Sequence, residues 1–418
     1  MAAKMKYFFC PLLLILFFFS NTFAQNPIVK LGIEVLVEKK FDILQGKRVG
    51  LVTNPSGVGS KLNSKIDILN AGEGYELVAL FGAEHGIRGD IEGGDKINDY
   101  KDAVTGLPVY SLYGKNRKPN EEVFEKIDVI VYDIQDVGCR SYTFISTLGK
   151  IMEAASEFDK EVVVLDRPNP LTGNKIEGNI VEEGYFSFIG QFEIPYVYGL
   201  TVGELALLLN NEGMLEDSVK CKLHVVKMDG WERNFTFEDT GLNWVPTSPH
   251  IPHKLSSAFY VMSGIVGELR DVISIGVGYT LPFQTFAYKD VNGITLSNKL
   301  NNLKLPGLLF MPISYKPYYA FGEGDHISGV EVFITDFQKA ELMKTQLYVL
   351  QELKIMYPDY NIFEETNQRH LNAFDRAMGT NKVREIFSKS FKVSDVDEYL
   401  DKDIEAFKKI SMKYYLYE

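Results

Sequence analysis

The chain has 418 residues, of which 45% are hydrophobic and 24% charged, and its formal net charge is −12. This length exceeds the size at which a single core stops growing, so two domains are expected, and the composition is ordinary for a globular protein. Nucleic-acid binding needs a basic face, which an acidic chain does not offer, so nucleic acid is excluded as a partner.

The first 24 residues have the composition of a secretory signal peptide. Lys4 and Lys6 precede an apolar run at residues 7–19, and Ala24 supplies a small residue just ahead of Gln25. The run is too short to span a membrane, and no later segment is long and apolar enough to do so. We therefore expect an exported, periplasmic protein with no stable membrane insertion after signal cleavage.

Short, continuous apolar runs in the rest of the chain predict strands that are buried on both faces of a sheet. They alternate with helical stretches, and Thr201 followed by Glu204 has the spacing of an N-terminal capping box. This alternation predicts an α/β fold with a Rossmann-like, doubly wound, mostly parallel sheet. The predicted strands are residues 49–54, 77–81, 108–111, 129–133, 162–166 and 221–228, and the predicted helices are residues 32–41, 64–71, 142–158 and 201–212, with another near Glu121.

A proline-rich segment separates this region from the rest of the chain. Residues 244–253 contain three prolines, and beyond them the alternation of strands and helices is lost. Strands are expected near residues 272–280, 307–312 and 329–335, followed by a long helix at 337–356. We predict a Rossmann-like catalytic domain at residues 25–245 and a smaller α+β domain at residues 246–418 that closes the active-site cleft.

Polar residues follow four of the predicted strands, at the point where each strand ends. Ligands of open α/β sheets bind in the crevice beyond the carboxyl ends of the strands, so these residues should form one active-site edge. The candidates are Asn54, Glu84, His85, Arg88, Asp133, Gln135, Asp136, Arg140, Tyr142, Arg167 and Asn169.

Glu84 is the first candidate for catalysis. It comes just after a buried strand, where loss of hydration raises a carboxyl pKa and suits a general acid, although an ion pair with Arg88 is the alternative. Asp133 or Asp136 would supply the second carboxylate that glycoside hydrolysis uses. Either could instead form a buried ion pair with Arg140 or cap the next helix.

Two further strand-end residues have both a functional and a structural interpretation. The guanidinium of Arg167 could hold a substrate carboxylate bidentately, or it could pair with Asp166. Asn54 could bind a sugar hydroxyl or begin an Asx turn.

The sequence predicts no cofactor and no metal ion. His250 and His253 have a spacing that suits zinc only on a helix, which the neighbouring prolines forbid. The phosphate-loop and dinucleotide glycine patterns do not follow the first strand. Cys139 and Cys221 remain after signal cleavage, which allows one disulfide or two free thiols and no disulfide framework.

Taken together, the motifs resemble those of the bacterial exo-β-N-acetylmuramidases of the NamZ type, formerly catalogued as a domain of unknown function. The resemblance covers nearly the whole mature chain. It is carried by GKRVGLVTNPSG at residues 46–57, LFGAEHGIRG at 80–89, LPVYSLYG at 107–114, YDIQDVG at 132–138, LDRPNPL at 165–171 and YGLTVGEL at 198–205.

This resemblance implies a site in the cleft between two domains and release of N-acetylmuramic acid from the non-reducing end of peptidoglycan fragments. It places the catalytic glutamate on Glu84 and makes the other strand-end residues sugar contacts. Glu268 is carried over as a substrate contact because it precedes the Thr-x-Pro-Phe turn at residues 280–283, in a more apolar neighbourhood than the family pattern has.

The expected partners are muramyl-glucosamine saccharides derived from peptidoglycan. Their lactyl carboxylate would be recognised by Arg88, Arg140 or Arg167, because guanidinium groups bind carboxylates well. Two alternatives remain open from the sequence. One is a non-catalytic protein that binds cell-wall sugars, and the other is a metal-dependent hydrolase that uses Glu84, His85 and Asp90.

Overall fold

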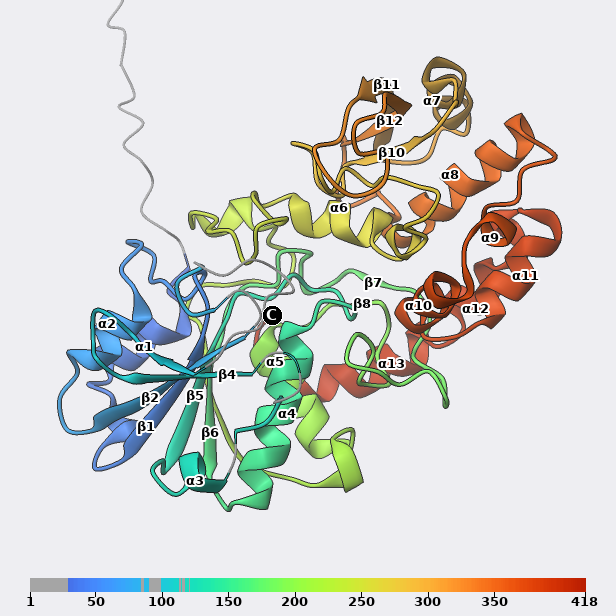
Figure 1. Cartoon of the computed structure of the whole chain (residues 1–418). Helices are drawn as coiled ribbons and strands as arrows, with labels where there is room; N and C mark the ends of the chain where they lie inside the picture. Colours follow the sequence, from blue (N-terminus) through green and yellow to red (C-terminus); the bar gives the residue numbers. More distant parts are fainter. Residues whose placement is uncertain (1–28, 84–85, 90–98, 113, 115–116, 120) are drawn as a thin grey trace, which may run out of the picture.

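The computed structural model describes residues 29–83, 86–89, 99–112, 114, 117–119 and 121–418 (Figure 1). The predicted signal at residues 1–24, and with it Lys4 and Lys6, lies outside this range. Among the helices of the described residues, none is both long and apolar enough to cross a membrane.

The first unit is built on a seven-stranded sheet with the order β3-β4-β2-β1-β5-β6-β9. Every neighbouring pair is parallel except β3 with β4, as expected for a doubly wound sheet. The predicted α/β fold is therefore confirmed. The strands are β1 (Arg48–Thr53), β2 (Glu76–Gly82), β3 (Tyr100–Lys101), β4 (Pro108–Ser111), β5 (Val129–Asp133), β6 (Glu161–Leu165) and β9 (Lys222–Val226).

Helices cover both faces of this sheet, and successive strand residues alternate between two cores. Val129 and Val131 of β5 pack with α1 (Gly32–Glu38) and α2 (Lys65–Asn70). On the opposite face Ile130 and Tyr132 pack with α4 (Phe144–Glu157) and α5 (Val202–Asn211), and the short α3 (Glu121–Phe124) lies on this side as well. The capping box predicted for α5 is present, since the backbone amide of Glu204 donates to Thr201 Oγ1 at 3.2 Å.

The second unit contains a three-stranded antiparallel sheet with the order β10-β12-β11. In Figure 1, α6 (Ser256–Ser263) lies between this small sheet and the large one. The small sheet consists of β10 (Thr285–Tyr288), β11 (Leu308–Tyr315) and β12 (Ile327–Ile334). The helices that follow α6 are α7 (Gly293–Asn302), α8 (Leu342–Met356), α9 (Ile362–Glu365), α10 (Gln368–Met378), α11 (Lys382–Ser390), α12 (Asp397–Asp401) and α13 (Ile404–Ser411).

One predicted strand of this unit is not formed. Residues 272–280 follow an irregular path whose pairing with a strand is the isolated bridge between Ser274 and Ala287. Gly276 and Gly278 have φ values of +82° and +86°, in the left-handed region that turns the chain. The apolar residues of this segment predict a strand, and the prediction is wrong because the two glycines turn the chain.

The end of the chain returns to the first unit. Phe407 of α13 belongs to the core beneath α4 and α5. The Tyr417 hydroxyl donates to Asp166 Oδ2 at 2.6 Å, and the Arg233 backbone amide donates to the Glu418 carbonyl at 2.8 Å. The last residues thus pack against the carboxyl end of β6. The domain boundary at residues 245 and 246 stays a prediction.

Candidate active site

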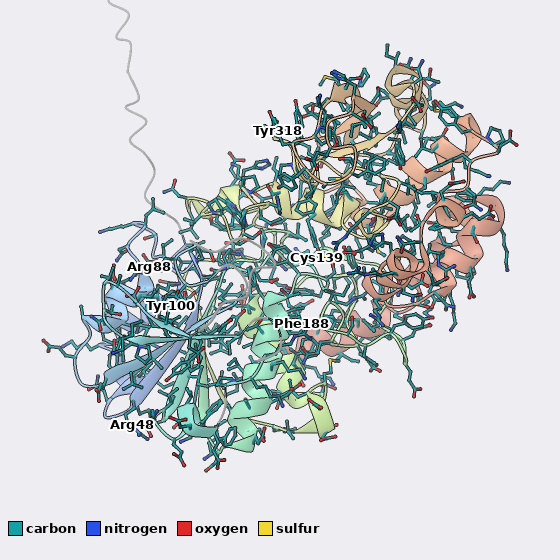
Figure 2. The ribbon with its side chains drawn as sticks, in the orientation of Figure 1. Arg48, Arg88, Tyr100, Cys139, Phe188 and Tyr318 are labelled. Atoms are coloured by element: carbon teal, nitrogen blue, oxygen red, sulfur yellow. The ribbon has the colours of Figure 1, made fainter. Side chains whose placement is uncertain are left out.

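The carboxyl ends of four adjacent strands gather the polar residues of the first unit. Because β2, β1, β5 and β6 are neighbours and parallel, the loops that follow them meet at one edge of the sheet. In Figure 2, Arg48 marks the opposite edge, where β1 begins, whereas Arg88 and Cys139 lie toward the second unit.

Asp133, the last residue of β5, is buried between two cations. Its Oδ1 accepts from Arg167 Nε at 2.6 Å, and its Oδ2 forms an ion pair with Lys65 Nζ from the start of α2. Burial and the nearby charge of Arg167 lower the pKa of Lys65 to about 7. The partners of Asp133 are thus Arg167 and Lys65, and Arg140 is not among them.

Asp136 lies three residues farther along and has a different environment. Its Oδ2 accepts from the backbone amide of Gly138 at 2.8 Å and from the hydroxyl of Tyr198, which β8 (Val197–Tyr198) supplies from its pairing with β7 (Ile176–Glu177). Its buried Oδ1 has no hydrogen-bond partner among the described residues. Burial raises the pKa of Asp136 to about 6, so this carboxyl can take up and release a proton near neutral pH.

Two amide side chains tie the loops after β1 and β5 to their surroundings. Asn54 Oδ1 accepts from the backbone amide of Ser56 at 3.0 Å, which is an Asx turn, and its Nδ2 donates to the Thr247 carbonyl at 3.1 Å. Gln135 Nε2 donates to the Pro168 carbonyl at 2.8 Å. The side chains of Asn54 and Gln135 therefore fix the backbone of the loops around the strand ends.

Asn169 has the same kind of role in the loop after β6. Its Nδ2 donates to the Leu200 carbonyl and its Oδ1 accepts from the Leu171 amide, both at 2.8 Å. In the same loop, the Arg167 amide donates to Asp166 Oδ1 at 3.0 Å, and Arg167 Nη2 donates to the Val58 carbonyl at 2.6 Å. The loops after β1 and β6 are therefore joined through one guanidinium.

Arg140 joins the two units. Its fully buried guanidinium donates to the Asn179 and Ile194 carbonyls at 2.6 and 2.8 Å, and to the Ala377 and Met378 carbonyls at 3.3 and 2.8 Å. The last two carbonyls belong to the end of α10, where helix carbonyls lack partners within the helix. The terminal nitrogens of Arg140 are therefore used within the protein.

The remaining strand-end candidates divide into described and undescribed residues. Arg88 forms a bidentate pair with Asp102, with Nε–Oδ1 at 2.7 Å and Nη2–Oδ2 at 3.0 Å, and its side chain is 32% exposed. The guanidinium holds the pKa of Asp102 well below its usual range. Glu84 and His85 lie outside the described residues, so the alternative pair of Glu84 with Arg88 stays a prediction.

An aromatic stack connects this edge to a cavity in the second unit. The Tyr142 hydroxyl bonds to Ser248 Oγ, and its ring meets the edge of Tyr260 at a centroid distance of 5.2 Å. Tyr260 of α6 in turn meets Phe283 at 4.9 Å. Tyr260 and Phe283 line a cavity of about 610 Å³, which we name the α6 cavity.

Glu268 also lines the α6 cavity, beside Arg270. Arg270 Nη2 lies 3.1 Å from Glu268 Oε2. The structure therefore places Glu268 in the second unit, on the cavity that the aromatic stack links to the loop after β5.

Sequence reasoning missed Lys65 and Tyr198, the partners of the two aspartates. Lys65 is the first residue of a helix, and no local pattern distinguishes it. Tyr198 begins the motif at 198–205, but nothing in the motif indicates that its hydroxyl bonds to Asp136. Cys139 and Cys221 are both buried free thiols, which agrees with one of the two alternatives. Within the described ranges, no group of three or more His, Cys, Asp or Glu side chains could hold a metal ion. Glu84, His85 and Asp90 all fall outside those ranges.

Comparison with known proteins matches both units to one family. A family model described as "Exo-beta-N-acetylmuramidase NamZ, N-terminal" matches residues 49–255, and the corresponding C-terminal model matches residues 258–417. A relative from Bacillus subtilis (strain 168), named peptidoglycan β-N-acetylmuramidase NamZ, is 40% identical over 398 residues, which is 95% of this chain and 94% of the relative.

Two solved structures from Bacteroides fragilis NCTC 9343 share the fold. Both are described as DUF1343 family proteins. One superimposes with a TM-score of 0.90 at 54% identity and covers 94% of this chain and 100% of that one. The other has a TM-score of 0.71 at 26% identity and covers 93% and 99%. Because the two family models together match residues 49–255 and 258–417, this chain belongs to the NamZ family of exo-β-N-acetylmuramidases, which are glycosidases.

Proposed function

We propose that this protein is an exo-acting glycoside hydrolase that releases N-acetylmuramic acid from the non-reducing end of peptidoglycan fragments. The support is its family and its 40% identity to a relative named as a peptidoglycan β-N-acetylmuramidase. The structural observation that carries the proposal is Asp136, a buried carboxyl at the strand edge with a pKa raised to about 6.

Glu84 is the proposed general acid that protonates the departing glycosidic oxygen. It lies in the motif that the family shares, two residues after β2 along the chain, and the preceding Ala83 is buried. Glu84 itself lies outside the described residues, so its role is proposed from its place in this motif. A general acid of this kind contributes about 10²–10⁴-fold to the rate.

Asp136 is the proposed second carboxylate, in preference to Asp133. Asp133 is paired with both Lys65 and Arg167, so its two carboxylate oxygens are already used within the protein. Asp136 has a buried oxygen with no partner among the described residues and faces no cation there. It can activate water or orient the substrate's own 2-acetamido group.

Recognition of the lactyl carboxylate is assigned to Arg88. Arg140 uses its terminal nitrogens on backbone carbonyls, and Arg167 is bound to Asp133 and the Val58 carbonyl. Arg88 is also paired, through Nε and Nη2 with Asp102, but it has the most exposed side chain of the three. A hydrogen bond from Arg88 to the sugar carboxylate would contribute about 1.5–3 kcal/mol to binding.

A defined muramyl-glucosamine disaccharide tests the function, with products identified by mass and by anomeric NMR. We expect wild-type protein to release N-acetylmuramic acid, and Glu84→Gln to lower kcat by about 10²–10⁴-fold while affinity for the disaccharide persists. Glu73→Gln, an exposed match for the same chemical change, should leave kcat unaltered.

Unchanged turnover in Glu84→Gln would remove Glu84 from the mechanism. Absence of any hydrolysis by the wild-type protein would overturn the proposed activity itself. Anomeric NMR of the first product also decides between inversion and retention.

We also propose that the protein is exported to the periplasm. The proposal rests on the signal-like composition of residues 1–24. A mature protein whose mass corresponds to a first residue of Gln25, recovered from a periplasmic extract, would support it, and an uncleaved cytoplasmic chain would refute it.

A further inference from the structure

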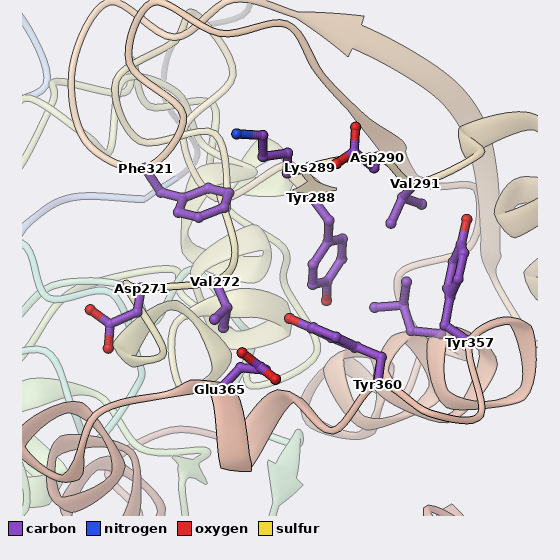
Figure 3. A pocket seen from close by; sticks show the side chains of 11 residues that line it. Asp271, Val272, Tyr288, Lys289, Asp290, Val291, Phe321, Tyr357, Tyr360 and Glu365 are labelled. Carbon is purple, nitrogen blue, oxygen red and sulfur yellow. The ribbon is translucent and has the colours of Figure 1, made fainter.

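A second cavity lies in the C-terminal unit, apart from the strand-end edge (Figure 3). It measures about 370 Å³, and we name it the β10 cavity because Tyr288, the last residue of β10, forms part of it. Its wall contains four aromatic rings and several charged side chains. The aromatic rings belong to Tyr288, Phe321, Tyr357 and Tyr360.

Tyr288 has a buried hydroxyl that the fold leaves unpaired. The residue is 2% exposed, and its hydroxyl has no hydrogen-bond partner among the described residues. Figure 3 shows the ring pointing into the cavity, with its hydroxyl toward Tyr360. A buried hydroxyl without a partner costs stability, so a folded protein rarely keeps one without a use.

The hydroxyl of Tyr288 stays protonated at any physiological pH. Burial raises its pKa well above the ordinary value. It is therefore available as a hydrogen-bond donor to a neutral acceptor such as a carbonyl or hydroxyl oxygen.

The rim of the β10 cavity carries carboxylates that lack cationic partners. Glu365 and Asp290 are exposed, and neither forms an ion pair with any described residue. Asp271, also on the wall, accepts from the Asn367 amide at 3.0 Å and lies 2.9 Å from His370 Nδ1. The wall also carries the ammonium group of Lys289, against three carboxylates. The rim therefore accepts hydrogen bonds, and its excess of negative charge repels other carboxylates.

We propose that the β10 cavity is a second saccharide site, which takes a neutral N-acetylated hexosamine of the glycan strand. Aromatic walls with a few polar groups are typical of small-ligand sites. Carboxylates accept from sugar hydroxyls and from the acetamido N–H, and the Tyr288 hydroxyl donates to the acetyl carbonyl. Charge repulsion at Glu365 and Asp290 excludes the acidic muramic acid, which the strand-end edge takes.

The two cavities share one side chain. Phe321 lines both the β10 cavity and the α6 cavity, which carries Glu268. It is flanked by Ala320 and Gly322, whose φ values are +67° and +79°. A left-handed alanine is strained, and such strain is kept where the surrounding structure needs the conformation. The two cavities therefore share a wall at Phe321, which places a sugar bound in the β10 cavity next to the cavity that carries Glu268.

This inference rests on the proposed function for its substrate class, but its test does not need hydrolysis. Chitotriose, a neutral oligomer of N-acetylglucosamine, contains no muramic acid and can be titrated into the full mature protein by calorimetry. We expect binding to wild type, and about 5- to 10-fold weaker binding to Tyr288→Phe and to Glu365→Gln. Tyr288→Phe should unfold at the same temperature as wild type or higher, because it removes an unpaired buried hydroxyl.

Two control variants make the same chemical changes outside the β10 cavity. Glu364→Gln neutralises the adjacent residue of α9, and Tyr348→Phe removes a hydroxyl from α8; neither residue lines the cavity. Both should bind chitotriose as wild type does. Equal affinity across all variants, or no binding of chitotriose to wild type, overturns the proposal.

A lysine-containing peptide separates the sugar from a cationic ligand. If the peptide binds in place of chitotriose and depends on Glu365 and Tyr288, the cavity is an ammonium site and the proposal is wrong. In hydrolysis, Tyr288→Phe should raise KM for long glycan fragments and leave KM for the disaccharide and kcat unchanged. Loss of activity on both substrates would instead indicate a structural defect and contradict the assignment.

Discussion

The strand-end edge of the first unit and the β10 cavity of the second unit differ in whether their polar side chains have partners within the protein. At the edge, Asp133 is bonded to Lys65 and Arg167, and the amide of Asn54 is bonded to backbone. In the cavity, among the described residues, the Tyr288 hydroxyl has no hydrogen-bond partner and the carboxylate of Glu365 forms no ion pair.

This contrast distinguishes polar groups that hold loops in place from polar groups that bind a ligand. Buried polar groups that satisfy one another hold loops in one geometry and are costly to break. Polar groups left unsatisfied around a hollow gain their partners only when a ligand arrives. Asp136 combines both properties: its Oδ2 accepts a hydrogen bond from Tyr198, whereas its Oδ1 has no hydrogen-bond partner in the described part of the chain.

The largest effect is expected from Asp133→Asn. The substitution removes the anion that Lys65 and Arg167 share and leaves the buried guanidinium of Arg167 without a counter-charge, so the free energy of unfolding should fall by about 3–5 kcal/mol. Urea denaturation at neutral pH measures it. Glu122→Gln, which breaks an exposed pair with Lys126, should lower the free energy of unfolding far less, because water screens that pair.

A loss below about 1 kcal/mol in Asp133→Asn would contradict the comparison. It would mean that the buried ion cluster does not hold the strand-end loops together. Lys65 and Arg167 would then be able to bind a ligand instead of Asp133.

Asp136→Asn should change how stability depends on pH. Burial raises the pKa of Asp136 from 3.8 to about 6, so the native state favours the protonated carboxyl. The contribution of Asp136 is fully present below pH 4 and is lost as pH rises through 6, by about 3 kcal/mol at 1.36 kcal/mol per unit. Because Asn does not ionise, the variant should gain stability relative to wild type over this range.

Urea denaturation of both proteins at several pH values between 4 and 7 provides the comparison. The difference between the two free energies of unfolding isolates Asp136 from the other titrating groups. Parallel curves across this range would show that Asp136 is hydrated in the native protein and would remove it as the second carboxylate.

The smallest change in stability is expected from Arg270→Ala, on the wall of the α6 cavity. The side chain of Arg270 is 65% exposed and its partner is the neighbouring Glu268. The free energy of unfolding should therefore stay within about 0.5 kcal/mol of wild type in thermal or urea denaturation. A loss above 2 kcal/mol would show that this region, like the strand-end edge, is held together by its charges.

The sequence predicted the large sheet well because buried parallel strands have an unambiguous pattern. The predicted strands at 49–54, 129–133 and 162–166 differ from β1, β5 and β6 by one residue at most at each end. The strand predicted at residues 272–280 is wrong. The apolar content of the segment is typical of a strand, but the left-handed Gly276 and Gly278 turn the chain. Apolar runs identify burial, but backbone conformation decides the element.

For the site, the sequence placed residues but not their partners. Asp133, Asp136 and Arg167 were expected at one edge because they end parallel strands. Which of the two aspartates forms ion pairs depended on Lys65, which lies at the start of α2 and contacts Asp133. Arg140 was a candidate for a sugar carboxylate, yet it binds the end of α10, far away in the chain.

Local order was determined by the sequence alone: the alternation of strands and helices, the capping box at Thr201, and the edge of the sheet where polar residues gather. Those features depend on interactions between residues close in the chain or on the period of the apolar pattern. The tertiary structure alone decided the raised pKa of Asp136, the ion pairs of Asp133 and, within the described residues, the lack of a partner for the Tyr288 hydroxyl. These depend on burial and on charges brought together from distant segments, and a linear pattern does not record either.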